Sequence, residues 1–318
     1  MVNAVFTGLY RYDESITNMT LKERISRLRD NGVNDIYWYV WKGYAKKSLE
    51  DYGVNIVEID EPFPHQKGIG GRQRQIYNVE TALRDFSDDE IILKLRWDLD
   101  FSDALIKNVT QETYFDKIEN GFLDNKIWTG FYSIQEMFSP ADKAFAGYKR
   151  DLNKLINFQY EINGVSANNY ISHDGMMLMS PLIEKNKEVS EFIQLTEPFP
   201  NGLMFQEEHY NSEGHLNAWA YSYYLLHRYF KTGPLGSCYF KRGDMSRWPF
   251  SFVDYNNFNY NYQTVIGKAP KLGLYPKYRV YNDAFITSLV NGEYKDDFGQ
   301  SLYKIISDNR EKWKSEGV

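Results

Sequence analysis

The first hundred residues alternate short apolar runs with segments whose apolar residues recur at every third or fourth position. Four of the runs have the length and composition of buried strands, and each ends at polar residues, Gly or Pro: residues 4–6, 35–41, 54–59 and 90–96. Strands that alternate with helices in this way form a mostly parallel sheet covered by helices. The pattern therefore predicts an α/β fold.

Capping residues mark where the intervening helices begin. Thr20 and Glu23 have the spacing of a capping box, and three apolar residues follow on one face of the predicted helix: Leu21, Ile25 and Leu28. A second helix is predicted after Gly71, because Ile76, Val79 and Leu83 also recur at helical spacing.

Beyond residue 101 the pattern is less regular. We expect strands near 126–132 and 174–180, and helices near 148–160, 182–194, 207–230 and 297–313. The chain thus divides into a regular half, residues 1–135, and a less regular half, residues 136–318, which together form one continuous domain.

Aromatic residues are unusually frequent, at 17% of the chain. Eighteen of the 63 residues from Trp219 to Tyr281 are aromatic, and Pro, Gly and Asn interrupt every regular pattern there. A Tyr ring packs against a ligand while its hydroxyl still bonds to water or to the ligand. The sequence therefore predicts an irregular, aromatic-rich C-terminal portion whose rings face sugar.

Charge and cysteine content restrict the partners and the compartment. The net charge of −6 argues against a general attraction to nucleic acid. Cys238 is the single cysteine, so no internal disulfide forms, and the chain fits a reducing compartment. No signal-like segment and no run of 18 apolar residues is present, so we expect a cytoplasmic protein.

The main chemical signal is a pair of carboxylates at the end of the fourth predicted strand. Asp98 and Asp100 are two residues apart, and Lys94 and Arg96 occupy the preceding alternate positions. Ligands of open α/β sheets bind beyond the carboxyl ends of the strands. Two acids with this spacing also occur at solvated turns, but with the basic residues they suit a divalent metal ion bound to a diphosphate.

The segments that surround this pair resemble a known family. Residues 60–62, 72–78 and 89–100 are similar to the WavE-type lipopolysaccharide-synthesis proteins, which look like GT-A-fold glycosyltransferases. The chain has Trp97 where those proteins have Thr. The resemblance implies a GT-A-like, Rossmann-related fold in which residues 1–135 bind a nucleotide sugar and residues 136–318 bind the acceptor.

The resemblance and the residue chemistry together select candidate site residues. The candidates for binding the nucleotide sugar are Thr7, Gly8, Tyr10, Arg11, Arg72, Arg74, Asn78, Lys94 and Arg96. The candidate ligands of Mn²⁺ or Mg²⁺ are Asp98, Asp100 and His215. The candidates for a catalytic base are Glu208, Asp142 and Asp174.

Each candidate also has a structural alternative. Thr7 and Gly8 fit an ordinary tight turn, Arg72 and Arg74 fit an exposed helix start, and an acid such as Glu208 before a helix stabilises the helix dipole.

The predicted activity is transfer of sugar from a UDP-, GDP- or CMP-sugar to a glycan or lipid-linked acceptor in surface polysaccharide synthesis. A lipid-linked acceptor would require peripheral contact with the inner face of the membrane. A non-catalytic carbohydrate-binding protein and a glycosidase are the alternatives, since both would use the same aromatic residues. The sequence leaves open the donor, the acceptor, the stereochemical outcome and the oligomeric state.

Overall fold

The computed structural model describes residues 1–10, 12, 19–62, 71–97, 99–101, 103–130, 138, 140, 144–156, 173–195, 213–232, 238–240, 283–293 and 297–318. The chain forms two compact units, each built from separate stretches of sequence. The first comprises residues 1–115, 143–153 and 233–270, and the second comprises 116–142, 154–232 and 271–318.

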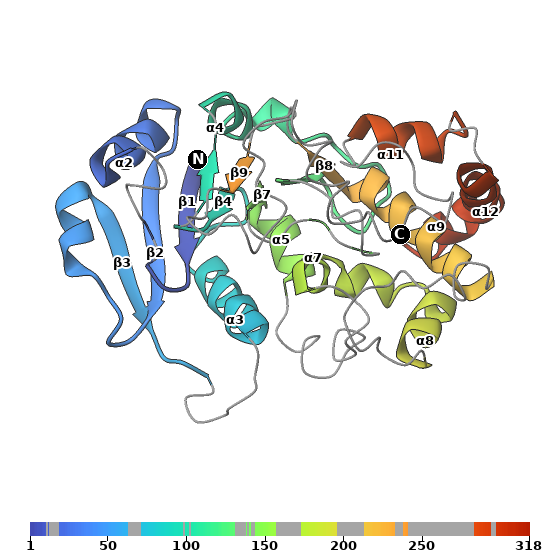
Figure 1. Cartoon of the computed structure of the whole chain (residues 1–318), viewed down its shortest axis with the longest axis horizontal. Helices are drawn as coiled ribbons and strands as arrows, with labels where there is room; N and C mark the ends of the chain where they lie inside the picture. The colour runs from blue at the N-terminus through green and yellow to red at the C-terminus, as the bar shows by residue number, and fades with distance from the viewer. Residues whose placement is uncertain are drawn as a thin grey trace, which may run out of the picture. The chain divides into compact units, whose positions relative to one another are not determined.

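The first unit is built on a mostly parallel sheet. Its strands stand in the order β3 (Val54–Ile59), β2 (Asp35–Trp41), β1 (Val2–Thr7), β4 (Ile91–Leu95) and β7 (Phe145–Tyr148). The first four run parallel, and β7 is antiparallel to β4. The arrowheads of β1, β2 and β3 point the same way in Figure 1. The predicted α/β fold with a mostly parallel sheet flanked by helices is confirmed, and the four predicted strands lie where expected.

Short helices lie between these strands or, in the case of the last one, follow β7. They are α2 (Leu21–Asp30), η1 (Lys47–Tyr52), α3 (Gly71–Leu83), α4 (Asp103–Val109), η2 (Glu112–Tyr114) and α5 (Lys149–Leu155). The capping box of α2 is present: the Glu23 amide donates to Thr20 Oγ1 at 3.2 Å, and the Thr20 amide donates to Glu23 Oε2 at 2.7 Å. These two bonds satisfy backbone donors that a helix start leaves free, which explains why α2 begins at Leu21.

A second, two-stranded sheet belongs to the same unit. The strand β5 (Leu99–Phe101) begins after a three-residue connection from the end of β4, and it pairs antiparallel with β9 (Cys238–Phe240). The backbone of Asp100 lies opposite that of Tyr239.

The second unit is mainly helical. The strands β6 (Ile127–Thr129) and β8 (Phe230–Thr232) pair in parallel. The helices are α7 (His173–Ile183), α8 (Lys187–Leu195), α9 (Glu213–Tyr229), α11 (Asp283–Val290) and α12 (Asp297–Ser315), and α9 packs against α8, α11 and α12.

Aromatic rings fix this helix packing. Trp313 of α12 lies against Tyr221 and Tyr224 of α9, with ring centroids 5.0 Å apart in both pairs. The hydroxyl of Tyr221 donates to the Leu182 carbonyl at 2.8 Å and so joins α9 to α7. Burial of Tyr221 raises the pKa of its phenol, so the hydroxyl stays protonated and keeps this bond.

One secondary-structure prediction is wrong. Residues 174–180 were expected to form a strand, but they belong to helix α7. The run Met176–Ser180 contains Met and Leu and has no β-branched residue, so its helix propensity exceeds its strand propensity. A short apolar run does not by itself distinguish a buried strand from a buried helix. Of the predicted aromatic-rich stretch from Trp219 to Tyr281, residues 233–237 and 241–281 lie outside the described residues.

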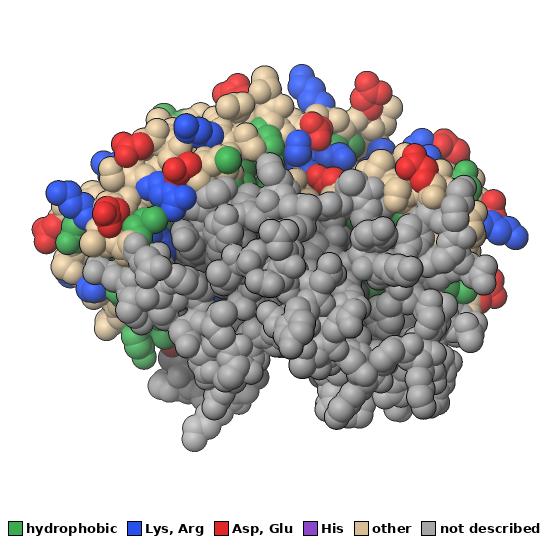
Figure 2. Space-filling model, turned by 45° about the horizontal axis from the view of Figure 1, so that its top comes forward, with side chains coloured by type: hydrophobic (Ala, Val, Ile, Leu, Met, Phe, Trp, Pro, Cys, Tyr) green, Lys and Arg blue, Asp and Glu red, His purple; other side chains and the backbone are tan. Residues whose placement is uncertain are grey.

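The described surface carries both signs of charge. Figure 2 shows Lys and Arg side chains interspersed with Asp and Glu over the part of this face that is described. Ion pairs among the described residues include Lys149 with Asp88 and Lys231 with Asp116. Within the described ranges, no helix has both the length and the apolar character needed to cross a membrane.

Candidate functional site

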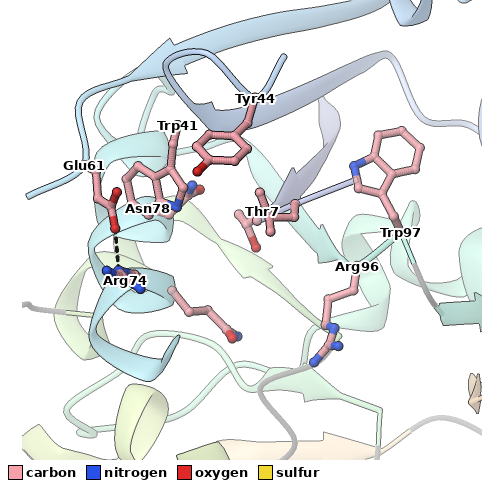
Figure 3. A pocket seen from close by; sticks show the side chains of 11 residues that line it. Thr7, Trp41, Tyr44, Glu61, Arg74, Asn78, Arg96 and Trp97 are labelled. Carbon is pink, nitrogen blue, oxygen red and sulfur yellow. Dashed lines mark ion pairs between the residues drawn. The ribbon is translucent and has the colours of Figure 1, made fainter. Parts of the chain in front are cut away.

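A pocket of about 390 Å³ lies at the carboxyl ends of the parallel strands of the first unit. All four parallel strands contribute residues from their ends, and α3 supplies the remaining wall. In Figure 3, Trp41, Tyr44, Glu61, Arg74 and Asn78 stand on one side of Thr7, and Arg96 and Trp97 stand on the other. Open α/β sheets bind their ligands at this edge. The volume is within the range of small-molecule sites.

The end of β1 brings backbone to the pocket. Thr7 is buried, and Gly8 has a φ of +84°, a conformation that glycine adopts without strain. The Gly8 carbonyl accepts a hydrogen bond from Trp38 Nε1 at 2.8 Å, which fixes the turn. Both predicted residues line the pocket.

The wall formed by β3 and α3 carries charge and an amide. Arg74 Nε forms an ion pair with Glu61 Oε1 (Figure 3). Asn78 is 1% exposed, and its Nδ2 donates to the Tyr39 carbonyl at 3.1 Å, whereas its Oδ1 has no hydrogen-bond partner among the described residues. The predicted residues Arg74 and Asn78 thus line the same wall of the pocket.

Tyr39 reinforces this wall from β2. Its hydroxyl donates to Asp85 Oδ2 at 2.7 Å. Burial, followed by the bond to Asp85, raises the pKa of Tyr39, so the phenol remains a donor at neutral pH. Tyr39 is therefore held at both its hydroxyl and its carbonyl, and the carbonyl holds Asn78 in turn.

The opposite wall follows β4 and is held by a buried arginine. Arg96 and Trp97 line the pocket, and both of their carbonyls accept hydrogen bonds from Arg24 of α2. The distances are 3.0 Å from Nη2 to the Arg96 oxygen and 3.1 Å from Nη1 to the Trp97 oxygen. Arg24 is 3% exposed, and its guanidinium lies over the rings of Phe6 and Tyr12.

Trp97 anchors this wall in the core. Its ring stacks on Phe6, with centroids 4.0 Å apart and planes 13° apart, and meets Trp38 edge to face at 6.0 Å. The indole is a large buried anchor, and Trp97 lies directly before Asp98 in the sequence.

Among the predicted residues of the first unit whose side chains are described, Tyr10 and Lys94 lie outside the pocket lining. Tyr10 packs against Trp38 and Trp97, with centroids 6.0 and 5.2 Å away, and the Lys46 ammonium lies 4.2 Å above its ring. Lys94 is fully buried, with Nζ 5.5 Å from the centre of the Phe145 ring of β7.

The other predicted residues fall beyond what is described. Asp98, Arg11, Glu208 and Asp142 lie outside the described residues. Arg72, Asp100, Asp174 and His215 have a described backbone, in α3, β5, α7 and α9 respectively, and their side chains lie outside the described part. The side chains that are described contain no cluster of three His, Cys, Asp or Glu suited to a metal ion.

Sequence reasoning did not select seven described residues of the site: Leu9, Arg24, Trp41, Tyr44, Glu61, Gln75 and Trp97. A signal existed for Arg24, since its position places it beside Leu21, Ile25 and Leu28 on the apolar face of α2. A signal also existed for Trp41 and Glu61, which end or follow predicted strands at the ligand edge. Nothing in the local sequence distinguishes Tyr44 from other loop tyrosines.

No family model matches the chain, and neither does any curated protein. Solved structures are similar to part of it. The galactosyltransferase LgtC, in complex with donor and acceptor sugar analogues, is 10% identical with a TM-score of 0.35, covering 56% of this chain and 71% of that one. The CTP:phosphocholine cytidylyltransferase LicC of Streptococcus pneumoniae is 11% identical with a TM-score of 0.33, covering 75% and 91%.

The inositol-1-phosphate CTP transferase of T. maritima is 14% identical with a TM-score of 0.29, covering 48% of this chain and 72% of that chain. At these scores the similarities decide neither fold nor activity.

Proposed function

We propose that this protein is a metal-dependent glycosyltransferase of the WavE type, GT-A-like in fold. It would transfer sugar from a nucleotide-sugar donor to a glycan or lipid-linked acceptor in surface polysaccharide synthesis. The observation that carries the proposal is the pocket at the carboxyl ends of four parallel strands, with arginines on both of its walls. A pocket of this kind suits a ligand that combines a flat ring with a diphosphate.

The two arginines are the proposed binding groups for the phosphates. Arg74 and Arg96 line opposite sides of Thr7 (Figure 3), and guanidinium groups match the geometry of phosphate oxygens. The Thr7–Gly8 turn lets the ligand approach backbone closely, since Gly8 has no side chain. Asn78 offers a buried acceptor oxygen beside the same space.

The metal assignment rests on the sequence. Asp98 and Asp100 follow the pocket residues Arg96 and Trp97 directly, and carboxylate oxygens suit Mn²⁺ and Mg²⁺. A divalent ion held there would stabilise the negative charge on the leaving diphosphate. His215 is the proposed further ligand. We propose that four further residues contribute to binding of the nucleotide sugar: Lys94, Arg72, Tyr10 and Arg11.

The acceptor side of the reaction is likewise a proposal from the sequence. Glu208, with Asp142 and Asp174 as alternatives, would remove the proton of the acceptor hydroxyl if the reaction inverts the sugar. A lipid-linked acceptor would bring a cytoplasmic protein to the inner face of the membrane.

Thermal stabilisation tests the donor class. The melting temperature is measured with UDP, GDP and CMP, each with and without Mn²⁺. A nucleotide that binds the folded state alone raises the melting temperature. We expect at least one of the three to give a rise that depends on Mn²⁺. A nucleotide effect that is unchanged by chelation would overturn the metal role, and no effect from any nucleotide would overturn the proposed function.

Matched variants connect the effect to the pocket. Arg74→Met should reduce the nucleotide-dependent shift, and Arg84→Met, an exposed arginine just after α3, should leave it unchanged. Because Arg74→Met leaves Glu61 unpaired, the double variant Arg74→Met with Glu61→Gln separates lost attraction from new repulsion. Asp98→Asn and Asp100→Asn should remove the dependence on Mn²⁺ while the protein stays folded.

A further inference from the structure

One aromatic residue of the pocket lining, Tyr44, differs from the others in its exposure and, among the described residues, in its lack of ring contacts. Of the three aromatic residues that line the pocket, Trp41 is 8% exposed and Trp97 is 1% exposed. Trp41 stacks on Tyr77, and Trp97 stacks on Phe6. Tyr44, in contrast, is 60% exposed, and among the described residues its ring meets no other ring.

The backbone that presents Tyr44 is nonetheless well fixed. The Tyr44 amide donates to the Trp41 carbonyl at 3.1 Å, and the Lys42 amide donates to the Ile59 carbonyl at 3.0 Å. Gly43 has a φ of +82°, and its amide donates to Glu58 Oε1 at 3.1 Å. The turn is therefore tied to β3 while its aromatic ring faces solvent.

A ring held in this way is suited to bind a ligand by stacking. Little conformational freedom of the backbone remains to be lost when a ligand binds, which favours affinity. Leu9, 42% exposed, also lines the pocket, so its mouth has a second apolar side chain. The charged groups Arg74, Glu61 and Arg96 line the same pocket, as Figure 3 shows.

A pocket lined by both exposed apolar side chains and charged groups matches the parts of a nucleoside diphosphate. Its phosphates require cations, and its base is the part with a flat apolar face. We propose that Tyr44 is the stacking platform for the nucleobase of the donor, whereas the sequence selected Tyr10 as the aromatic residue that binds the nucleotide sugar. This inference rests on the proposed function and extends it to the subsite of the base.

The assignment explains the different surroundings of the two tyrosines. Tyr10 already has Trp38, Trp97 and Lys46 against its ring. A base would have to displace one of these groups to stack there. Tyr44 offers its ring without such a rearrangement.

The experiment compares binding of nucleoside diphosphate and inorganic pyrophosphate to three variants by titration calorimetry, at constant Mn²⁺. Tyr44→Ala removes the ring, Tyr44→Phe keeps it, and Tyr52→Ala removes an exposed Tyr of η1 that is outside the pocket lining. Stacking of a base on an aromatic side chain predicts a loss of affinity of roughly 5- to 150-fold for Tyr44→Ala. Tyr44→Phe and Tyr52→Ala should bind as the wild type does.

The two ligands distinguish base from phosphate. Tyr44→Ala should bind pyrophosphate as the wild type does, because that ligand has no base. Equal loss for both ligands, or unchanged nucleotide binding by Tyr44→Ala, would overturn the inference and leave the proposed function standing.

A wild-type protein that binds pyrophosphate but no nucleotide would instead overturn the proposed function, and the inference with it. Loss of affinity for a nucleotide sugar without any loss for the nucleoside diphosphate would place a sugar on Tyr44 and also overturn the inference.

Discussion

Arg24 offers a direct test of how the pocket wall is held. The change Arg24→Met keeps a long apolar side chain in contact with Phe6 and Tyr12 but removes both donors to the carbonyls of Arg96 and Trp97. Leaving a buried acceptor without its donor costs roughly 1–3 kcal/mol. Removal of the buried charge offsets part of the cost of two such carbonyls, since a buried ion is itself unfavourable.

We therefore expect the free energy of unfolding to fall by about 2–4 kcal/mol. Urea unfolding followed by tryptophan fluorescence measures this change. Trp97 accepts one of the hydrogen bonds that the substitution removes, and its ring contacts Trp38. Arg24→Lys should recover only part of the loss, since one ammonium group lacks the planar fork that reaches both carbonyls.

Arg27→Met is the matched control on the same helix. Arg27 pairs with Asp103 at the surface, with side chains 25% and 55% exposed, and pairs of this kind contribute roughly 0.2–1 kcal/mol. If Arg24→Met destabilised the protein no more than Arg27→Met, the two carbonyl bonds would not hold the wall and the reasoning would be refuted.

Three further predictions concern stability. Thr20→Ala removes the acceptor for the Glu23 amide and should lower the free energy of unfolding by about 1 kcal/mol, as measured by urea unfolding. No loss of stability would mean that the cap is dispensable. Tyr221→Phe removes the donor to the Leu182 carbonyl and should lower the free energy of unfolding by roughly 1–2 kcal/mol in the same measurement. Unchanged stability would show that the carbonyl finds another donor. Burial lowers the pKa of His227 from 6.5 to about 4. Between these two pH values the unfolded chain binds a proton at His227 and the folded chain does not, so stability should fall as the pH drops from about 6.5 to 4. His227→Asn should reduce that slope, and an unchanged slope would assign it to other groups.

The sheet was predictable because its strands are uniform in character. The runs 35–41 and 54–59 contain β-branched and aromatic residues and stop at Lys42 and Asp60, and β2 and β3 have the same limits. The run that became α7 lacked those residues, so its length and apolarity alone gave the wrong assignment. Local composition decides an element only where propensity and burial point to the same structure.

The site was predictable at its strand ends and less so elsewhere. Thr7, Gly8 and Arg96 follow from the rule that ligands bind beyond the carboxyl ends of parallel strands. Asn78 and Arg74 lie on a helix whose rotation relative to the sheet depends on packing, and a sequence window of α3 does not fix that rotation. Arg24 was not predicted, because charged side chains usually face water. Its spacing with Leu21 and Leu28 nevertheless placed it on the buried face of α2.

The pairing of β5 with β9 bears on the order in which the chain folds. The strands β1 to β4 are all synthesised within the first hundred residues, so they can pair before the rest of the chain exists. The segment that carries Asp100 must wait for Cys238–Phe240, and closing so long a loop costs entropy and slows folding. A nascent chain stopped before residue 238 would therefore have its four parallel strands while β5, which follows the pocket wall, lacked its partner.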